Sequence, residues 1–187
     1  MKASLALAAC FLVAAASAQT PGTQGLRTVK TLVVYYSLTG KTQAVAQALA
    51  AELGADIRRV EDLEKPEASF WFIVKGGFAA MRGVESEIKP IDTAFQGYDR
   101  VFVGSPVWGG SPSTPINAFI AKADFSGKDV VLFMTMGSDD ASGALRKMGE
   151  RIEKKGGKIV DSFAFSSGET TEEELAGKAR QTARRYR

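Results

Sequence analysis

Residues 31–42 read Thr-Leu-Val-Val-Tyr-Tyr-Ser-Leu-Thr-Gly-Lys-Thr, and an alanine-rich stretch follows them directly. The continuous apolar run at 32–35 predicts a strand that is buried on both faces. The apolar spacing over 42–53 predicts a helix that ends at Gly54. The junction therefore places hydroxyls, a glycine and a lysine at a helix N-terminus, where unpaired backbone N–H groups and the helix dipole favour an anion.

Strands and helices alternate along the rest of the chain. Further strands are predicted at 56–60, 100–105, 129–135 and 159–165, and further helices at 114–122, 142–155 and 171–186. Such alternation is typical of parallel βαβ units. We therefore expect one α/β domain over residues 29–187, with a central sheet and helices on both faces.

Residues 67–83 are rich in aromatic side chains and contain Gly76-Gly77. They fit a second sheet-packing helix that is kinked or broken at the glycines, which is the interpretation we favour. They also fit a flap over a ligand or the contact surface of a homodimer, because many aromatic groups lie beside a glycine hinge.

The N-terminus has the pattern of a secretory signal. Lys2 precedes a short apolar run at 5–16, and Ala16-Ser17-Ala18 offers a small-residue cleavage site. We expect a signal peptide over 1–18, a flexible lead-in over 19–28 and export to a bacterial periplasm. A run this short makes no transmembrane segment, since spanning takes ~20 apolar residues. The apolar run continues past Cys10, which disfavours lipoprotein anchoring through that residue.

The composition excludes several kinds of active site. The chain has no His, and its one Cys lies in the predicted signal, so a Ser-His-Asp triad, a Cys-His pair and a His-ligated metal are all ruled out. The formal net charge of +3, from 24 basic and 21 acidic residues, is too even for a polyanion binder, and no nucleic acid is expected. If the protein is an enzyme, a bound cofactor supplies its reactivity.

Two unusual loops follow the first and third predicted strands. They are residues 37–42 and residues 105–112, Ser-Pro-Val-Trp-Gly-Gly-Ser-Pro. In an open sheet of order 2-1-3-4-5 the ligand crevice lies between these two strands. Backbone amides and hydroxyls at 37–42 suit a phosphate monoester, with Lys41 adding charge, and Trp108 offers a flat face to an aromatic ring.

Plainer explanations exist for both loops. The hydroxyls could be helix caps, and Trp108 could plug the end of the sheet. A cap needs one hydroxyl, whereas three converge beside a glycine and a lysine here, so we favour a ligand. A nucleoside-triphosphate loop is disfavoured, because its first glycine would have to stand at Tyr35.

At three places the chain resembles the flavodoxin-like family. These are Ser-x-Thr-Gly-x-Thr at 37–42, Gly-Ser-Pro-Val-Trp-Gly at 104–109 and Thr-Met-Gly-Ser at 135–138, each at the end of a predicted strand. The resemblance runs from about Val29 to the C-terminus. It implies a single doubly wound, five-stranded parallel sheet of order 2-1-3-4-5, and FMN as the cofactor.

The resemblance also implies positions for the cofactor. The FMN phosphate would be bound by Ser37, Thr39, Gly40, Lys41 and Thr42, and the isoalloxazine would be bordered by Pro106, Val107, Trp108 and Gly109 and, on its other side, by Gly137 and Ser138. No side chain is expected to be catalytic, because the flavin itself exchanges electrons or hydride.

The implied function is that of an FMN-binding redox protein that reduces a small acceptor such as a quinone, as an FMN-dependent NAD(P)H:acceptor oxidoreductase. Residues 136–143 contain no aromatic side chain, so one face of the flavin would stay open to such an acceptor. One alternative is an electron-transfer module that serves a redox partner protein without substrate turnover of its own. Another is a flavodoxin fold that has lost its flavin.

Overall fold

The computed structural model describes residues 29–63, 77–137 and 140–187. The predicted signal peptide and lead-in, most of the aromatic stretch 67–83, and Ser138 lie outside the described residues. Residues 77–81 of the aromatic stretch are helical.

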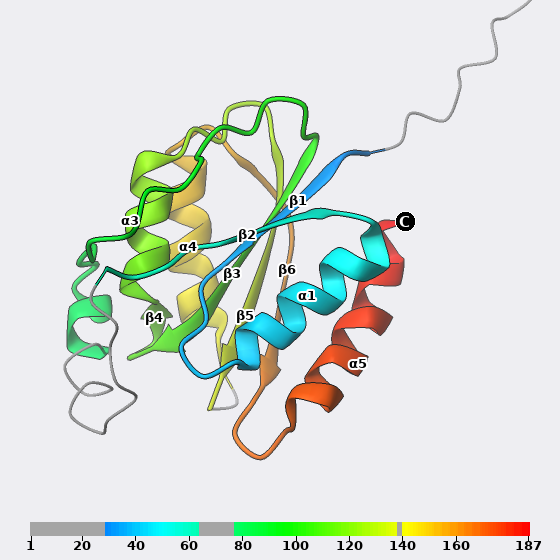
Figure 1. Cartoon of the computed structure of the whole chain (residues 1–187). Coiled ribbons are helices and arrows are strands. Elements are labelled where there is room, and N and C mark those ends of the chain that lie inside the picture. The colour runs from blue at the N-terminus through cyan, green and yellow to red at the C-terminus, as the bar shows by residue number, and fades with distance from the viewer. Residues whose placement is uncertain (1–28, 64–76, 138–139) are drawn as a thin grey trace, which may run out of the picture.

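The centre of the molecule is a parallel sheet (Figure 1). Its strands lie in the order β2-β1-β3-β5-β6. When these five parallel strands are numbered along the chain, this is the predicted order 2-1-3-4-5. The strands are β1 (Thr31–Tyr35), β2 (Asp56–Arg59), β3 (Arg100–Trp108), β5 (Asp129–Met136) and β6 (Lys158–Ser166). The prediction of five strands is corrected in one respect, because the two-residue strand β4 (Ser111–Pro112) pairs with β3 off this path and makes a sixth.

Helices cover both faces of the sheet (Figure 1). On one face lie α1 (Lys41–Leu53) and α5 (Glu172–Ala183), and on the other lie α3 (Thr114–Lys122) and α4 (Ser142–Glu153). Alternate residues of β1 enter the two cores: Leu32 and Val34 pack on the α3–α4 side, and Val33 and Tyr35 pack on the α1–α5 side. Both faces of β1 are therefore buried, which explains why its sequence is a continuous apolar run.

Local signals set the helix ends. Gly54 adopts the left-handed conformation that ends α1, as its position after an apolar-periodic stretch predicts. Thr171 and Glu174 form a capping box at the start of α5, with the Glu174 N–H donating to Thr171 Oγ1 and the Thr171 N–H to Glu174 Oε2.

Among the described residues, every helix is too short or too polar to cross a bilayer.

The end of the third strand differs from the prediction. Strand β3 continues to Trp108 instead of ending at Ser105, and it turns back into β4 as a hairpin. The turn residues Gly109 and Gly110 have φ angles of 53° and 67°. Two left-handed residues suit the twist of a two-residue hairpin, and glycine adopts that conformation without strain. The stretch interpreted as an open loop is thus an ordered ribbon.

Gly104, in the middle of β3, lies directly against the buried ring of Phe133 in β5, and a Cβ at this position would overlap that ring. We expect Gly104→Ala to lower the free energy of unfolding by about 1–3 kcal/mol, because the packed ring has no free space to move into. Urea denaturation measures this change.

The matched control is Gly177→Ala in α5, where an added Cβ meets nothing within 4 Å. That variant should be equal to the parent or more stable by about 0.5–1 kcal/mol, since alanine favours a helix over glycine. Equal loss of stability in both variants would contradict the packing role of Gly104.

Candidate functional site

The predicted loops meet at the carboxyl edge of the sheet. Backbone pairing aligns the strands so that the Tyr36 N–H donates to the Gly104 carbonyl at 3.1 Å, and Pro106 lies beside Thr135 in the parallel ladder of β3 and β5. The chain segments that leave β1, β3 and β5 therefore start from one edge. Gly137 is the exposed residue that follows β5. Ser138, the other residue predicted there, is outside the described part of the chain.

The N-terminus of α1 is open to an acceptor. Its N-cap is Gly40, which has φ of 91° and no side chain, and the first turn contains no acidic residue. In the described part of the chain no side-chain cap bonds the first-turn amides. The Gly40 N–H itself donates to Ser37 Oγ at 3.2 Å, which holds the turn in place. The helix thus presents N–H donors and the positive end of its dipole with no acidic side chain in its own first turn.

Gly40 also allows a close approach by α5. A Cβ on Gly40 would overlap the carboxylate of Glu172, the first residue of that helix. Glycine is favoured here by its positive φ, and its missing Cβ also lets the Glu172 carboxylate come close. The Glu172 carboxylate brings a negative charge to the same corner, and it would repel a bound phosphate. Glu172 was not among the residues that the sequence predicted for this site.

The predicted phosphate residues divide into two groups. Thr39 is exposed and Gly40 is half-buried, so these two lie at the surface of the loop. Lys41 and Thr42 hold the loop to its neighbours instead. The Lys41 ammonium donates to the Thr170 carbonyl at 2.6 Å, and Thr42 Oγ1 lies 2.7 Å from Thr135 Oγ1.

The pair of threonines is buried, with Thr42 1% and Thr135 3% exposed. One hydroxyl donates to the other, and this hydrogen bond joins the start of α1 to the end of β5. Sequence patterns named Thr135 only as part of a motif. A hydrogen bond across 93 residues of chain has no local signal that would reveal it.

Trp108 ends β3 and is half-buried. Its ring meets Tyr36 edge-on, with centroids 5.7 Å apart and planes at 89°. Burial raises the pKa of the Tyr36 phenol, and the nearby charge of Asp62 raises it further, so the ring is neutral at physiological pH. An apolar aromatic corner therefore adjoins the loop 37–40.

The hairpin that carries Trp108 is held from several sides. The Lys147 ammonium of α4 donates to the Gly110 carbonyl at 3.0 Å and to Ser111 Oγ at 2.8 Å. Gly109 lies close to Gly77, whose carbonyl oxygen would be 2.6 Å from a Cβ added to Gly109. At the base of the hairpin Ser105 Oγ accepts a hydrogen bond from the Ser113 N–H. The ring of Trp108 thus stands on a braced ribbon.

A cavity of about 210 Å³ lies on the β2 side of the first loop, lined by Tyr36, Ser37, Leu38, Arg59, Val60, Glu61 and Asp62. Arg59 donates to the Ser37 carbonyl at 3.3 Å and to Gln43 Oε1 at 3.0 Å. It is a cation beside the loop that the sequence patterns did not assign. Its signal would have been its position at the end of the strand that pairs with β1.

The donor set at this edge consists of amides, hydroxyls and an aromatic ring. Within the three described ranges, no group of three or more His, Cys, Asp or Glu side chains converges to hold a metal. Amides at a helix N-terminus with nearby hydroxyls suit a phosphate group, and an aromatic wall beside them suits a planar ring. The residues present fit a mononucleotide that has both parts.

Comparison with known proteins gives a family match. The flavodoxin family matches residues 30–176 of the chain. No match is found among curated proteins.

Solved structures show a similar fold at low identity. A protein of Bacteroides uniformis, provisionally designated a flavoprotein, is 23% identical with a TM-score of 0.68, over 81% of this chain and 98% of that one. A flavoprotein of Lactobacillus acidophilus, solved in complex with FMN, is 23% identical with a TM-score of 0.63, over 73% and 93%. Flavodoxin 2 of Bacillus cereus is 18% identical with a TM-score of 0.53, over 83% and 95%. At these identities the likeness establishes the fold.

The Thr42–Thr135 pair gives a prediction about stability. Thr135→Val should cost about 1–3 kcal/mol, because it leaves the buried Thr42 hydroxyl without its partner. The double variant Thr42→Val with Thr135→Val should cost less than the sum of the two single changes, since it leaves neither hydroxyl unsatisfied. Urea denaturation of the four proteins measures the coupling, and additive losses would show that the two hydroxyls do not interact.

Proposed function

The chain belongs to the flavodoxin family, whose cofactor is FMN, and on this premise we propose that it binds FMN at the carboxyl edge of the sheet and transfers electrons through it to a small acceptor such as a quinone. The observation that carries the proposal is the uncapped N-terminus of α1 behind the left-handed Gly40. An open helix end on a short strand-to-helix turn is a site for a phosphate monoester. FMN carries such a group at the end of its ribityl chain.

The phosphate end of the site is assigned to loop 37–42. The first-turn amides of α1 and the exposed Thr39 hydroxyl would donate to the phosphate, while Ser37 holds Gly40 in its turn. Lys41 would contribute its charge while its ammonium stays on the Thr170 carbonyl. Thr42 would act through Thr135, keeping the helix start aligned with the end of β5. Charge-assisted hydrogen bonds of this kind are about twice as strong as neutral ones.

The ring end is assigned to the braced hairpin and the start of the loop after β5. Pro106 and Val107 lead into Trp108, which offers an aromatic wall, and Gly109 allows the backbone to come close to a planar ligand. Gly137 and Ser138 would lie toward the other side of the ring. The neutral Tyr36 behind Trp108 keeps this corner apolar.

Bound FMN supplies the chemistry, because its ring system exchanges one or two electrons and protons. The chain's own residues bind and orient the cofactor and exclude water from one side of it. No titratable side chain of the described edge is assigned a proton transfer. This division fits a chain with no His and with its one Cys at position 10.

Two modes of use remain for such a site. Reduction of a small acceptor, with NAD(P)H as the electron donor, is favoured by residues 136–143, which contain no aromatic side chain to cover a second face of the flavin. The alternative is an electron-transfer module for a redox partner protein, which needs no catalytic side chain. Steady-state NAD(P)H oxidation with a quinone distinguishes the two.

We also propose that the protein acts after export, as residues 1–18 suggest, and cell fractionation tests this placement.

FMN binding can be tested at the loop itself. Thr39→Ala, combined with Ser37→Ala, should weaken FMN binding tenfold or more, because both changes remove polar support at the phosphate end. Glu172→Gln should tighten binding, because it removes the negative charge that contacts Gly40. Calorimetric titration of the apoprotein with FMN measures both changes.

The control for the hydroxyl variants is Ser126→Ala, on the loop before β5 at the opposite edge of the sheet, where its hydroxyl bonds only Asp124. Its affinity for FMN should equal that of the parent. A purified protein that stays colourless and takes up no FMN at millimolar concentration would refute the proposed function.

The ring site makes a separate prediction. A tryptophan stacked on a flavin quenches its fluorescence, so Trp108→Phe should raise the emission of bound FMN severalfold while the aromatic packing against Tyr36 is kept. Emission is measured at full occupancy. The control is Tyr98→Phe, which changes an aromatic residue just before β3, at the opposite edge of the sheet. Unchanged emission in Trp108→Phe would remove Trp108 from the ring site.

A further inference from the structure

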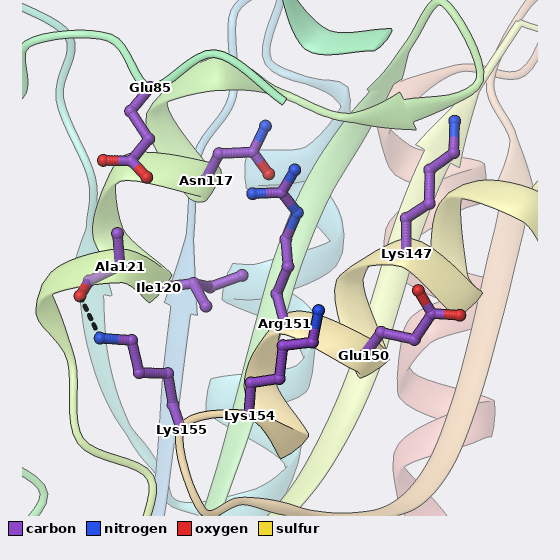
Figure 2. Close-up of a pocket in the computed structure, with 9 residues that line it drawn as sticks. All are labelled: Glu85, Asn117, Ile120, Ala121, Lys147, Glu150, Arg151, Lys154 and Lys155. Carbon is purple, nitrogen blue, oxygen red and sulfur yellow. Dashed lines mark hydrogen bonds between the residues drawn. The ribbon is translucent and has the colours of Figure 1, made fainter. Parts of the chain in front are cut away.

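A second polar cavity lies away from the carboxyl-edge loops, in the groove between α3 and α4 (Figure 2). Its volume is about 430 Å³, which lies within the range of small-molecule sites. Its walls come from both helices and from the segment that follows the short helix 77–81. The charged residues of the lining are Glu85, Lys147, Glu150, Arg151, Lys154 and Lys155.

The cavity carries an excess of positive charge, and part of that charge has no protein partner. Lys147 is engaged by the hairpin, and the Lys155 ammonium donates to the Ala121 carbonyl at 2.5 Å. Within residues 29–63, 77–137 and 140–187, the side chains of Arg151 and Lys154 form no hydrogen bond or ion pair. Arg151 is half-buried, and the N–H donors of its guanidinium are free to bind an acceptor that comes from outside the chain.

The space around Arg151 is shaped for its head group. A Cβ on Gly83 would overlap Arg151 Nη2, so glycine at this position makes room for the guanidinium. Gly83 also has φ of 71°, a conformation that other residues rarely adopt. The Arg151 side chain therefore lies along the wall of the cavity, with its head group beside Gly83.

A buried amide gives an independent sign of a ligand. Asn117 is 1% exposed, and its Nδ2 donates to the Val84 and Pro112 carbonyls at 3.4 Å each. These bonds fix the orientation of the amide and turn Oδ1 toward the Arg151 guanidinium (Figure 2). Among the described groups, Oδ1 finds no hydrogen-bond donor. Buried side-chain acceptors are rarely left without a hydrogen-bond donor, and each such case calls for an explanation.

We propose that the α3–α4 groove binds a small phosphate ester that also carries a hydroxyl group. The phosphate oxygens would accept from Arg151 and Lys154, and the hydroxyl would donate to Asn117 Oδ1. Ile120 and Ala121 provide the apolar floor for the carbon skeleton. One ligand of this class thus satisfies the unpartnered cations and the unpartnered amide oxygen together. A simple anion would satisfy the cations alone.

The carboxylate of Glu85 on the rim provides an internal check. It carries the same sign as the ligand, so Glu85→Gln should tighten binding of a phosphate ester severalfold. If Arg151 served only as an ion-pair partner of Glu85, that variant would instead lower stability and leave ligand binding absent. Glu150 is expected to repel the ligand less than Glu85 does, because its carboxylate pairs with Arg146 at 2.6 Å.

The test is a calorimetric titration of the FMN-saturated protein with glycerol 3-phosphate, with glycerol and inorganic phosphate as the two partial ligands. Saturation with FMN occupies the carboxyl-edge site, so that binding there is excluded. Glycerol 3-phosphate should bind at least tenfold more tightly than inorganic phosphate, and glycerol should give no signal. If the protein takes up no FMN, the same titration is made on the apoprotein and on its Arg151→Gln variant, and only binding that this variant weakens is assigned to the groove.

Arg151→Gln should weaken glycerol 3-phosphate binding tenfold or more and leave FMN binding unchanged. The matched control is Arg180→Gln, which changes an exposed arginine of α5 on the other face of the sheet, outside the cavity. It should bind glycerol 3-phosphate as the parent does, and thermal unfolding confirms that both variants fold. Equal weakening in the two variants would show non-specific screening of charge, and an absence of binding at millimolar concentration would overturn the proposal.

Discussion

The left-handed turn at Gly40 is the constraint from which the carboxyl-edge site follows. The chain must change from the buried strand β1 to helix α1 within residues 36–40, and it does so with φ of 91° at Gly40. A residue with a side chain would be strained there and would overlap the carboxylate of Glu172. Because glycine has no side-chain acceptor, the same residue that permits the turn also leaves the helix uncapped. The tight turn and the open helix end thus have a single origin.

Parallel pairing places the remaining parts of the site beside this turn. The Tyr36 N–H on the Gly104 carbonyl aligns β1 with β3, and the threonine pair 42 and 135 joins α1 to β5. The hairpin after β3 is then braced by Lys147 and by Ser105. Each of these contacts is made by the chain itself, so the edge is organised before any ligand arrives. A preorganised site binds with a smaller entropic cost than one that must be ordered by its ligand.

Local patterns were enough to predict most of the architecture. The apolar run of β1 and the glycine that ends α1 are signals within a few residues, and the structure contains both. The end of β3 was predicted wrongly, because Pro106 and two glycines suggest a loop, whereas Gly109 and Gly110 make a tight hairpin turn. The bonds of Lys41 to Thr170 and of Thr42 to Thr135 could not be predicted, since 129 and 93 residues of chain separate the partners. Sequence motifs thus located the edge, but the tertiary contacts decide which side chains are already engaged.

That distinction changes how the charge of the chain is interpreted. A formal net charge of +3 says little about anion binding, because many cations are occupied by carbonyl oxygens of the fold. Lys41, Lys147 and Lys155 each donate to a backbone carbonyl, and an anion could take their ammonium groups only by breaking those bonds. At the carboxyl edge the groups that remain are amides and the Thr39 hydroxyl, which suit one phosphate at a helix end. In the α3–α4 groove the groups that remain are the guanidinium of Arg151 and the ammonium of Lys154. Anion sites in an evenly charged protein are therefore found among the donors that folding has left unpaired.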